Sequence, residues 1–509
     1  MAFKFLTTLF CLLVLLTGAA AQPSPAAAAR EYRQAHEYEI ISEYIRLLSV
    51  PNVSADLPNV RRNAELISQL LAQRGVSTRL LELSGAAPVV YGEINTPGAT
   101  RTLIFYAHYD GQPVEPEKWA GGNPFRPVLR SAALEAGGKD LPLPAQGEKF
   151  DPEWRLYARS TGDDKAPVMA LLAALDALRA RQMPLTSNIR FFFEGEEEAG
   201  SAHLEQFVEK YRELLTGDVW LFCDGPVSQN RQQQIYFGAR GVVSLQLTVY
   251  GPHRELHSGH YGNWAPNPAL RLARLLASMK DDDGRVLIED YYSGIEPLSA
   301  TERQALAAAP DNDESLKREL LIGGTEGGGR KLNELLNEPS LNIRGLASAS
   351  TGQTARNVIP STAVAEIDIR LVRGIDYRTA VERVLRHIRK QGYQIVTDEP
   401  DEATRLKHPK LIKVIVHSGY NAARTSMDLP ISRQVIAAIE SARGPSVRMP
   451  TLGGTVPLYI FTDILKVPAI GIPIANHDNN QHSANENIRL QNLWDGIELM
   501  AALLAMKQF

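Results

Sequence analysis

Between residues 31 and 225, short apolar runs alternate with segments of helical periodicity, and this alternation constrains the fold more than any other feature of the sequence. The runs TLIFYAHYD at 102–110 and NIRFFFEGEE at 188–197 are apolar on both faces. Strands of this kind must be covered by helices on both sides, which is typical of parallel strands that are joined through helices. The sequence therefore predicts an α/β domain whose largely parallel sheet is sandwiched by helices.

The expected elements follow one another with few interruptions. Helices are predicted at 37–50, 60–75, 166–181 and 202–215, and strands at 78–83, 89–94, 102–110, 188–197 and 218–225. The same pattern resumes with a helix at 430–444, a strand at 468–474 and a helix at 490–507. The α/β domain is therefore expected to consist of two separate parts, residues 30–240 and 424–509.

After Gly238 the pattern changes to strands with alternating polar and apolar residues, as in VVSLQLTVYG and TAVAEIDIRLV. Each such strand is followed by a segment of helical periodicity. Alternation of this kind indicates strands that are buried on one face only. The sequence therefore predicts a smaller α+β domain, residues 241–423, inserted into the larger one.

The charge balance narrows the class of partner. The 509 residues include 54 Lys and Arg and 58 Asp and Glu, which gives a formal net charge of −4. The basic residues form no long run of the kind that binds nucleic acid or an anionic membrane surface. A small molecule or a short peptide is the expected partner.

The first 21 residues have the pattern of a signal peptide. An apolar run extends from Phe5 to Leu16, and small residues at 19–21 resemble a signal-peptidase site. A membrane helix is the alternative, but the run is short for a bilayer span. The sequence thus predicts an exported protein, periplasmic or secreted, without a stable membrane anchor. Cleavage would remove Cys11 and leave Cys223 unpaired.

Metal-ligand residue types stand where the predicted strands end. In an open parallel sheet these ends share one edge, where loops open into a crevice. The residues are His108 and Asp110, Glu197 and Glu198, Asp224, His477 and His482, with Asp163 and Asp164 before a helix. Each motif alone is weak evidence, since acidic runs are usually solvated. Together, imidazole and carboxylate groups suit zinc or manganese, and two such ions need a shared carboxylate.

Eight segments carry a specific resemblance. They are AHYDGQPVEPEKW, RSTGDDKAPVMA, FFFEGEEEAGS, CDG, RELHSGHYG, ARNVIPSTAVAEIDIRLV, GGTVP and HDNNQHSANENI. In sequence and order they resemble the two-metal exopeptidase family of carnosine dipeptidase, glutamate carboxypeptidase, aminoacylase and succinyl-diaminopimelate desuccinylase. The HYDGQP form and the long inserted domain are most similar to the carnosine dipeptidase branch.

The resemblance implies two divalent metal ions, zinc or alternatively manganese. One would be held by His108, Asp163 and Asp224, and the other by Asp163, Glu198 and His482. Asp163 would bridge the two ions. The resemblance also implies a cis peptide bond between Asp163 and Asp164.

The remaining catalytic roles are implied in the same way. Asp110 would fix the tautomer of His108, and Glu197 would be the general base. The neighbouring Glu194 and Glu196 are expected to be hydrogen-bonded or solvated, without a catalytic role. His257 would reach the partner subunit's site and stabilise the oxyanion.

Substrate-binding residues are implied by the later motifs. These are Asn357 and Arg370, which would bind the substrate carboxylate, and Gly453, Gly454 and Thr455, which would line the site. An arginine suits this task because its planar guanidinium grips a carboxylate with two hydrogen bonds.

The sequence also departs from the family pattern. The segment ARS at 158–160 stands where the family usually has Gly-Arg-Gly, and residues 131–154 form an insertion without a readable motif.

The sequence as a whole predicts a homodimeric metallo-exopeptidase that hydrolyses dipeptides or short peptides with a free C-terminal carboxylate. An N-acyl-amino-acid deacylase would use the same metals and is the nearest alternative. A non-catalytic binding domain on this fold is a third possibility, but such a domain normally lacks ligands or the base, and here every position is filled.

Overall fold

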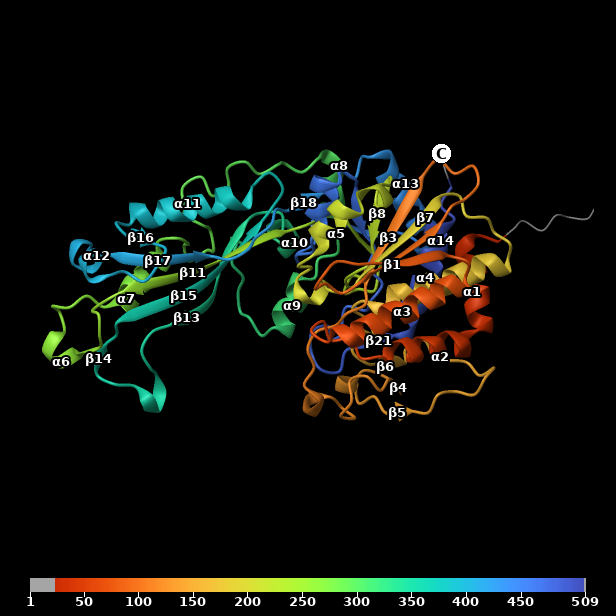
Figure 1. Cartoon of the computed structure of the whole chain (residues 1–509), viewed down its shortest axis with the longest axis horizontal. Coiled ribbons are helices and arrows are strands. Elements are labelled where there is room, and N and C mark those ends of the chain that lie inside the picture. Colours follow the sequence, from red (N-terminus) through yellow and green to blue (C-terminus); the bar gives the residue numbers. More distant parts are fainter. Residues whose placement is uncertain (1–22, 508–509) are drawn as a thin grey trace, which may run out of the picture.

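A computed structural model describes residues 23–507. Figure 1 shows an elongated molecule with a larger lobe, built on an eight-stranded sheet, and a smaller lobe, built on a five-stranded sheet. The predicted signal peptide and Cys11 lie outside the described residues. No helix between residues 23 and 507 is long and apolar enough to cross a bilayer. Cys223, the one cysteine in this range, is a free and buried thiol.

The eight-stranded sheet has the strand order β1-β2-β7-β3-β8-β20-β9-β19. The strands are β1 (Ser77–Leu81), β2 (Val89–Ile94), β3 (Thr102–His108), β7 (Asn188–Glu194), β8 (Val219–Phe222), β9 (Gln234–Tyr236), β19 (Val447–Met449) and β20 (Ala469–Gly471). The central run β7-β3-β8-β20 is parallel, as predicted. At one edge β1 and β2 run antiparallel, because the short connection at 82–88 reverses the chain without a crossover helix.

Helices cover both faces of this sheet. One face packs against α1 (Pro25–Ala35), α2 (Glu37–Leu48), α3 (Leu57–Gln73), α4 (Lys165–Ala180), α13 (Pro430–Arg443) and α14 (Leu490–Leu504). The other packs against α5 (Leu204–Lys210) and a π-helical turn at Ile460–Ile464. Phe191 and Phe193 belong to the first core and Phe192 to the second, which explains why the strand is apolar on both faces.

The smaller sheet has the strand order β13-β15-β11-β17-β16. Its strands are β11 (Gly241–Tyr250), β13 (Ser340–Ala347), β15 (Thr362–Leu371), β16 (Gln394–Val396) and β17 (Leu411–Val416). The helices α7 (Pro268–Ala277) and α11 (Tyr377–Lys390) cover one face and enclose a separate core with Val243, Leu245 and Leu247. The predicted fold class, a sandwiched α/β domain with a smaller inserted α+β domain, is confirmed.

Shorter elements connect and flank the lobes. The strands β10 (Gly238–Ala239) and β18 (Ala423–Arg424) pair where the chain enters and leaves the smaller lobe. The others are β12 (Leu256–His257), β14 (Val358–Ile359), α6 (Ser258–Tyr261), α8 (Ala300–Ala308), α9 (Asp313–Glu319), α10 (Leu332–Leu335) and α12 (Glu402–Lys407).

Some elements are absent from the sequence-based prediction. The helix α1 is one, because its alanine-rich sequence lies beside the expected cleavage site. A further sheet with the order β21-β6-β4-β5 is another. Its strands are β4 (Val128–Arg130), β5 (Asp140–Leu141), β6 (Arg155–Tyr157) and β21 (Asn487–Arg489). The insertion at 131–154 thus contributes β5, the edge strand at the opposite side of this sheet from β21.

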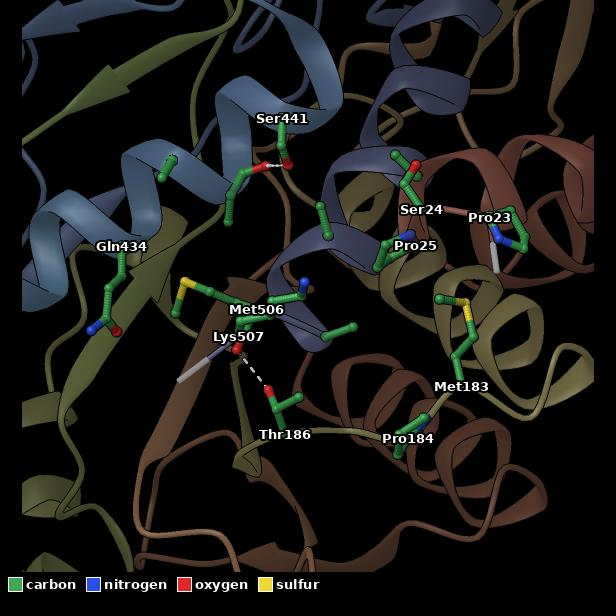
Figure 2. Close-up of a pocket in the computed structure, with 15 residues that line it drawn as sticks. Pro23, Ser24, Pro25, Met183, Pro184, Thr186, Gln434, Ser441, Met506 and Lys507 are labelled. Atoms are coloured by element: carbon green, nitrogen blue, oxygen red, sulfur yellow. Dashed lines mark hydrogen bonds between the residues drawn. The ribbon is translucent and has the colours of Figure 1, made fainter. Parts of the chain in front are cut away.

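A cavity of about 560 Å³ lies between α1, α13 and the end of α14 (Figure 2). Its lining is mainly apolar and includes Pro25, Met183 and Met506. Among the described residues that line it, none is a histidine, cysteine, aspartate or glutamate. The described residues around this cavity therefore offer no carboxylate, imidazole or thiol that could bind a metal ion.

Candidate active site

The candidate metal ligands come together at the carboxyl ends of three adjacent parallel strands. His108 is the last residue of β3, Asp224 follows β8, and Glu197 and Glu198 follow β7. Because β7, β3 and β8 are neighbours in that order, the loops after them open at one edge of the sheet. The sheet topology thereby brings His108 close to Asp224, which lies more than 100 residues later in the sequence.

One group of potential ligands consists of His108, Asp163 and Asp224. All three are buried, and one ligand atom from each lies within 4.8 Å of the others. Nε2 of His108 is 2.8 Å from Oδ1 of Asp163. The peptide bond between Asp163 and Asp164 is cis, as the resemblance implied.

A second group consists of Asp163, Glu198 and His482, again with ligand atoms within 4.8 Å of one another. Nε2 of His482 lies 3.2 Å from Oδ2 of Asp163 and 3.3 Å from Oε2 of Glu198. Asp163 therefore turns one oxygen toward each group. His477, the other histidine in this loop, is exposed and belongs to neither group.

The electrostatics of the two groups call for cations. Burial raises the pKa of Glu198 to about 7 and that of Asp224 to about 6. Burial also opposes ionisation of Asp163, but hydrogen bonds from His108 and His482 hold its pKa below the usual range. The hydrogen bond to Asp163 raises the pKa of His482 to about 9. Clustered carboxylates with two imidazoles fit divalent zinc or manganese. The positive charge of such ions would offset the repulsion between the carboxylates.

Asp110 is more extensively bonded than the resemblance implied. Its Oδ1 lies 3.3 Å from Nδ1 of His108, close but without an aligned hydrogen bond. Its carboxylate also accepts the backbone N–H groups of Glu197 at 3.2 Å and Glu198 at 3.0 Å. Ser54 donates its hydroxyl to Oδ2 at 2.9 Å. Asp110 therefore links the loop after β3 to the turn after β7.

Glu197 lies beside the first ligand group. Its Oε2 is 3.9 Å from Nε2 of His108, and burial raises its pKa well above the usual range. Its acidic neighbours are bonded elsewhere. Glu194 accepts the hydroxyl of Tyr106 at 2.7 Å, and Glu196 accepts the backbone N–H of Ala87 at 2.8 Å. The prediction that these two carboxylates are hydrogen-bonded is confirmed.

The predicted substrate-binding residues fall into two separate places. Arg370, near the end of β15, donates a hydrogen bond to the hydroxyl of Thr455 at the junction of the two lobes. Gly453 and Gly454 precede Thr455 in the same loop, which follows β19. These residues, which are distant in the sequence, are brought together.

Asn357, the remaining predicted substrate-binding residue, lies at the tip of the smaller lobe together with His257, the predicted oxyanion donor. His257 is exposed in β12, which pairs with β14, and the backbone N–H of Ser258 donates to the carbonyl of Asn357 at 2.9 Å. Figure 1 shows β14 and α6 at the end of the molecule that points away from the larger lobe. A single chain therefore does not bring His257 and Asn357 to the metal-ligand groups.

Two site residues were missed in the sequence. Gln112 donates its amide to Oε2 of Glu198 at 2.7 Å, and its position two residues after Asp110 in HYDGQP was the available signal. Lys165 is fully buried and donates to Oδ1 of Asn63 at 2.7 Å and to the carbonyl of Leu47. Burial lowers its pKa to about 7. Lys165 lies in the motif RSTGDDKAPVMA, but nothing in that motif showed that its side chain would be buried.

Comparisons with known proteins agree with this geometry. Residues 104–506 match the family described as Peptidase family M20/M25/M40. The chain is 28% identical over 422 residues to the Beta-Ala-His dipeptidase of Homo sapiens, covering 82% of this chain and 76% of the relative. It is 24% identical over 487 residues to the Cys-Gly metallodipeptidase dug1 of Schizosaccharomyces pombe, covering 91% and 94%.

Solved structures show the same fold. An M20 family metallo-carboxypeptidase, Sso-CP2 from Sulfolobus solfataricus, superposes with a TM-score of 0.73 at 26% identity and covers 92% of this chain and 99% of its own. Human carnosine dipeptidase 1 superposes with a TM-score of 0.72 at 23% identity, covering 95% and 99%.

The comparisons contradict the prediction of export. The relatives, among them the Cys-Gly metallodipeptidases and the Beta-Ala-His dipeptidase, give no indication of an exported protein. The pattern on which the prediction depended lies in residues 1–21, outside the described part. The assignment to the periplasm or the extracellular space is therefore withdrawn.

The family match extends from the middle of β3 to just beyond α14 and so includes all five candidate metal ligands. With two ligand groups sharing one carboxylate on the matching fold, the chain belongs to Peptidase family M20/M25/M40.

Proposed function

We propose that this protein is a two-metal exopeptidase that hydrolyses dipeptides or other short peptides with a free C-terminal carboxylate. The observation that carries the proposal is the position of Asp163, with one oxygen toward each ligand group and Glu197 beside them. The names of the relatives, Beta-Ala-His dipeptidase and Cys-Gly metallodipeptidase, support dipeptides as the substrate class.

His108, Asp163 and Asp224 would hold one ion, and Asp163, Glu198 and His482 the other, with zinc as the proposed native metal. When bound, two such ions lower the pKa of a water and polarise the substrate carbonyl. Glu197 would accept the proton of the attacking water and pass it to the leaving amine.

Asp110 is proposed to hold both His108 and the turn that carries Glu197. Arg370, Asn357, Gly453, Gly454 and Thr455 are proposed to bind the substrate. The contact between Arg370 and Thr455 supports a carboxylate site at the junction of the lobes, since a guanidinium and a hydroxyl both donate to a carboxylate.

We further propose that the active unit is a homodimer in which His257 and Asn357 serve the partner's site. Two observations support it. His257 is exposed in β12, which pairs with β14, and Figure 1 shows β14 at the end of the smaller lobe that points away from the larger lobe. The sheet of this lobe also ends in the edge strand β13, where Ile343 and Leu346 are 44% and 61% exposed. Apolar side chains on an edge strand are suited to pairing with a second copy.

We also propose that the chain is divided into domains as the sequence predicts. Residues 30–240 and 424–509 would form the catalytic domain, and 241–423 a lid and dimerisation domain. The pairing of β10 with β18 at the crossing points supports these limits.

An N-acyl-amino-acid deacylase remains the alternative enzyme, because it would use the same metals. The test is turnover of a dipeptide panel against N-acetyl amino acids by the zinc-loaded protein, with C-terminally amidated dipeptides as a control. Cleavage of free but not amidated dipeptides supports the proposal. Preference for N-acetyl amino acids would favour the deacylase, and stoichiometric metal without any hydrolysis would favour a binding domain.

A further inference from the structure

Glu486 is a buried carboxylate that binds the loop ending at Asp163, more than 300 residues away in the sequence. Its side chain is 1% exposed. Oε1 accepts the backbone N–H groups of Gly162 at 2.9 Å and Asp163 at 3.0 Å. Oε2 accepts the N–H of Ser160 at 2.8 Å and Nη1 of Arg159 at 2.9 Å. Four donors therefore occupy both oxygens, so this carboxylate is not available as a metal ligand.

The loop needs an external partner to keep its shape. Ser160 has a φ of +62°, in the left-handed region that a non-glycine residue seldom adopts. Its side chain is bonded twice, to Asn52 at 2.8 Å and to the carbonyl of Asp110 at 3.1 Å. Such a conformation persists only where the surroundings hold it, and the acceptor for the Ser160 N–H is Glu486.

Arg159 supplies the opposite charge. Its side chain is 2% exposed, and its guanidinium lies over the ring of Trp119 at 5.2 Å. Burial raises the pKa of Glu486, and the charge of Arg159 opposes that rise. A buried carboxylate with one cation and three N–H donors is well stabilised, and it becomes unfavourable when one partner is lost.

Glu486 also belongs to the loop that carries His482. Its own carbonyl accepts the backbone N–H of Ala158 at 3.2 Å, and the next residue, Asn487, pairs with Tyr157 across β21 and β6. One residue thus joins the loop of Asp163 to the loop of His482. These two residues belong to the same potential ligand group, and Asp163 belongs to both groups.

We propose that Glu486 is a positioning residue for the two-metal centre. By holding the backbone of Gly162 and Asp163, it keeps the Asp163 carboxylate between the two ligand groups and keeps the His482 loop beside it. This inference rests on the proposed function, because it assumes that Asp163 and His482 bind metal. Groups that hold metal ligands in place typically affect metal affinity about 10–100-fold when they are mutated.

The test replaces Glu486 in the full chain and measures zinc affinity by chelator competition, together with kcat, KM and the thermal midpoint of the metal-free protein. In Glu486→Gln, one oxygen becomes an NH₂ group that cannot accept, so two of the four donors lose their acceptor. Zinc binding is expected to weaken about 10–100-fold. KM at saturating zinc should stay unchanged, because Glu486 does not touch the substrate.

The matched control is Glu498→Gln. Glu498 is also a buried carboxylate, and it lies in α14, away from both loops. It accepts two hydrogen bonds from Arg30, at 2.9 and 2.6 Å. This variant should lower the thermal midpoint and leave zinc affinity at the wild-type value. A role of Glu486 in general stability alone would make the two variants behave alike.

A second variant, Glu486→Asp, keeps the charge opposite Arg159 but is too short to reach Gly162 and Asp163 together. It should fold if Glu486→Gln does not, and it should also bind zinc more weakly than the wild type. Wild-type zinc affinity in either folded variant overturns the inference. Failure of the wild-type protein itself to bind zinc would instead contradict the proposed function.

Discussion

The carboxylate of Asp110 accepts the backbone N–H of Glu198 at 3.0 Å, so the residue beside His108 also holds a proposed ligand of the second ion. The neighbouring N–H of Glu197 donates to the same carboxylate at 3.2 Å. One side chain thereby sets the spacing between a metal ligand on β3 and the acidic turn after β7.

Replacing Asp110 with asparagine should impair both metal binding and turnover. The amide has only one accepting oxygen. The substitution therefore removes either Oδ1, which faces His108 and accepts the N–H of Glu197, or Oδ2, which accepts the N–H of Glu198. Metal affinity and kcat/KM should each fall about 10–100-fold, as measured by chelator competition and initial rates. Ser54→Ala is the control, because it removes one hydrogen bond to Asp110 and leaves the carboxylate intact. Equal effects of the two substitutions would contradict this role.

Replacing Glu197 with glutamine should abolish turnover and leave two metal ions bound. The amide cannot accept a proton, and the expected loss in kcat is on the order of 10²–10⁴-fold. Elemental analysis checks the metal content, and Glu205→Gln, an exposed position in α5, is the control. Near-normal activity of Glu197→Gln would show that another group is the base.

The metal-free protein should lose stability as the pH rises. The pKa values of Glu198, Asp224 and His482 are raised from 4.5, 3.8 and 6.5 to about 7, 6 and 9 in the folded state. The folded state therefore holds protons that the unfolded chain has released, and the stability that they contribute is lost as the pH rises through these values. The share of His482 is reduced by solvent, because its side chain is 54% exposed.

Zinc should reverse this trend, because its ligands must be deprotonated and binding releases protons. The measurement is the thermal midpoint of chelator-treated protein from roughly pH 5 to 9, with and without zinc. The increase produced by zinc should grow with pH. A zinc effect that is constant across this range would contradict the proposed ligand set.

Mixing two inactive variants should restore part of the activity. If His257 serves the partner's site, a heterodimer of His257→Ala and Glu197→Gln contains one site with an intact base and an intact histidine. Loss of an oxyanion donor costs about 10²–10³-fold in turnover, so restored activity should be clear above background. Native mass spectrometry verifies that subunits exchange. Heterodimers that form without any gain in activity would contradict the shared-site model.

Much of the larger lobe could be predicted because its signals are local. The alternation around Phe191, Phe192 and Phe193 indicates a strand that is buried on both faces, and the two cores on either side confirm it. The four-stranded sheet with β5 and β6 could not be predicted in this way. Its strands are two or three residues long, and β6 pairs with β21, more than 300 residues away, so no local pattern marks them.

The sequence by itself determined the fold class, the family motifs and the residue types of the candidate site, because these follow from local periodicity and from side-chain chemistry. Only the tertiary structure decided how these residues are held. The bonds from Asp110 to the Glu197–Glu198 turn and from Glu486 to the Asp163 loop join segments that are distant in the chain. Such contacts depend on which strands are neighbours in the sheets and on which acceptors lie beside the buried N–H groups. No single segment of the sequence determines either of these.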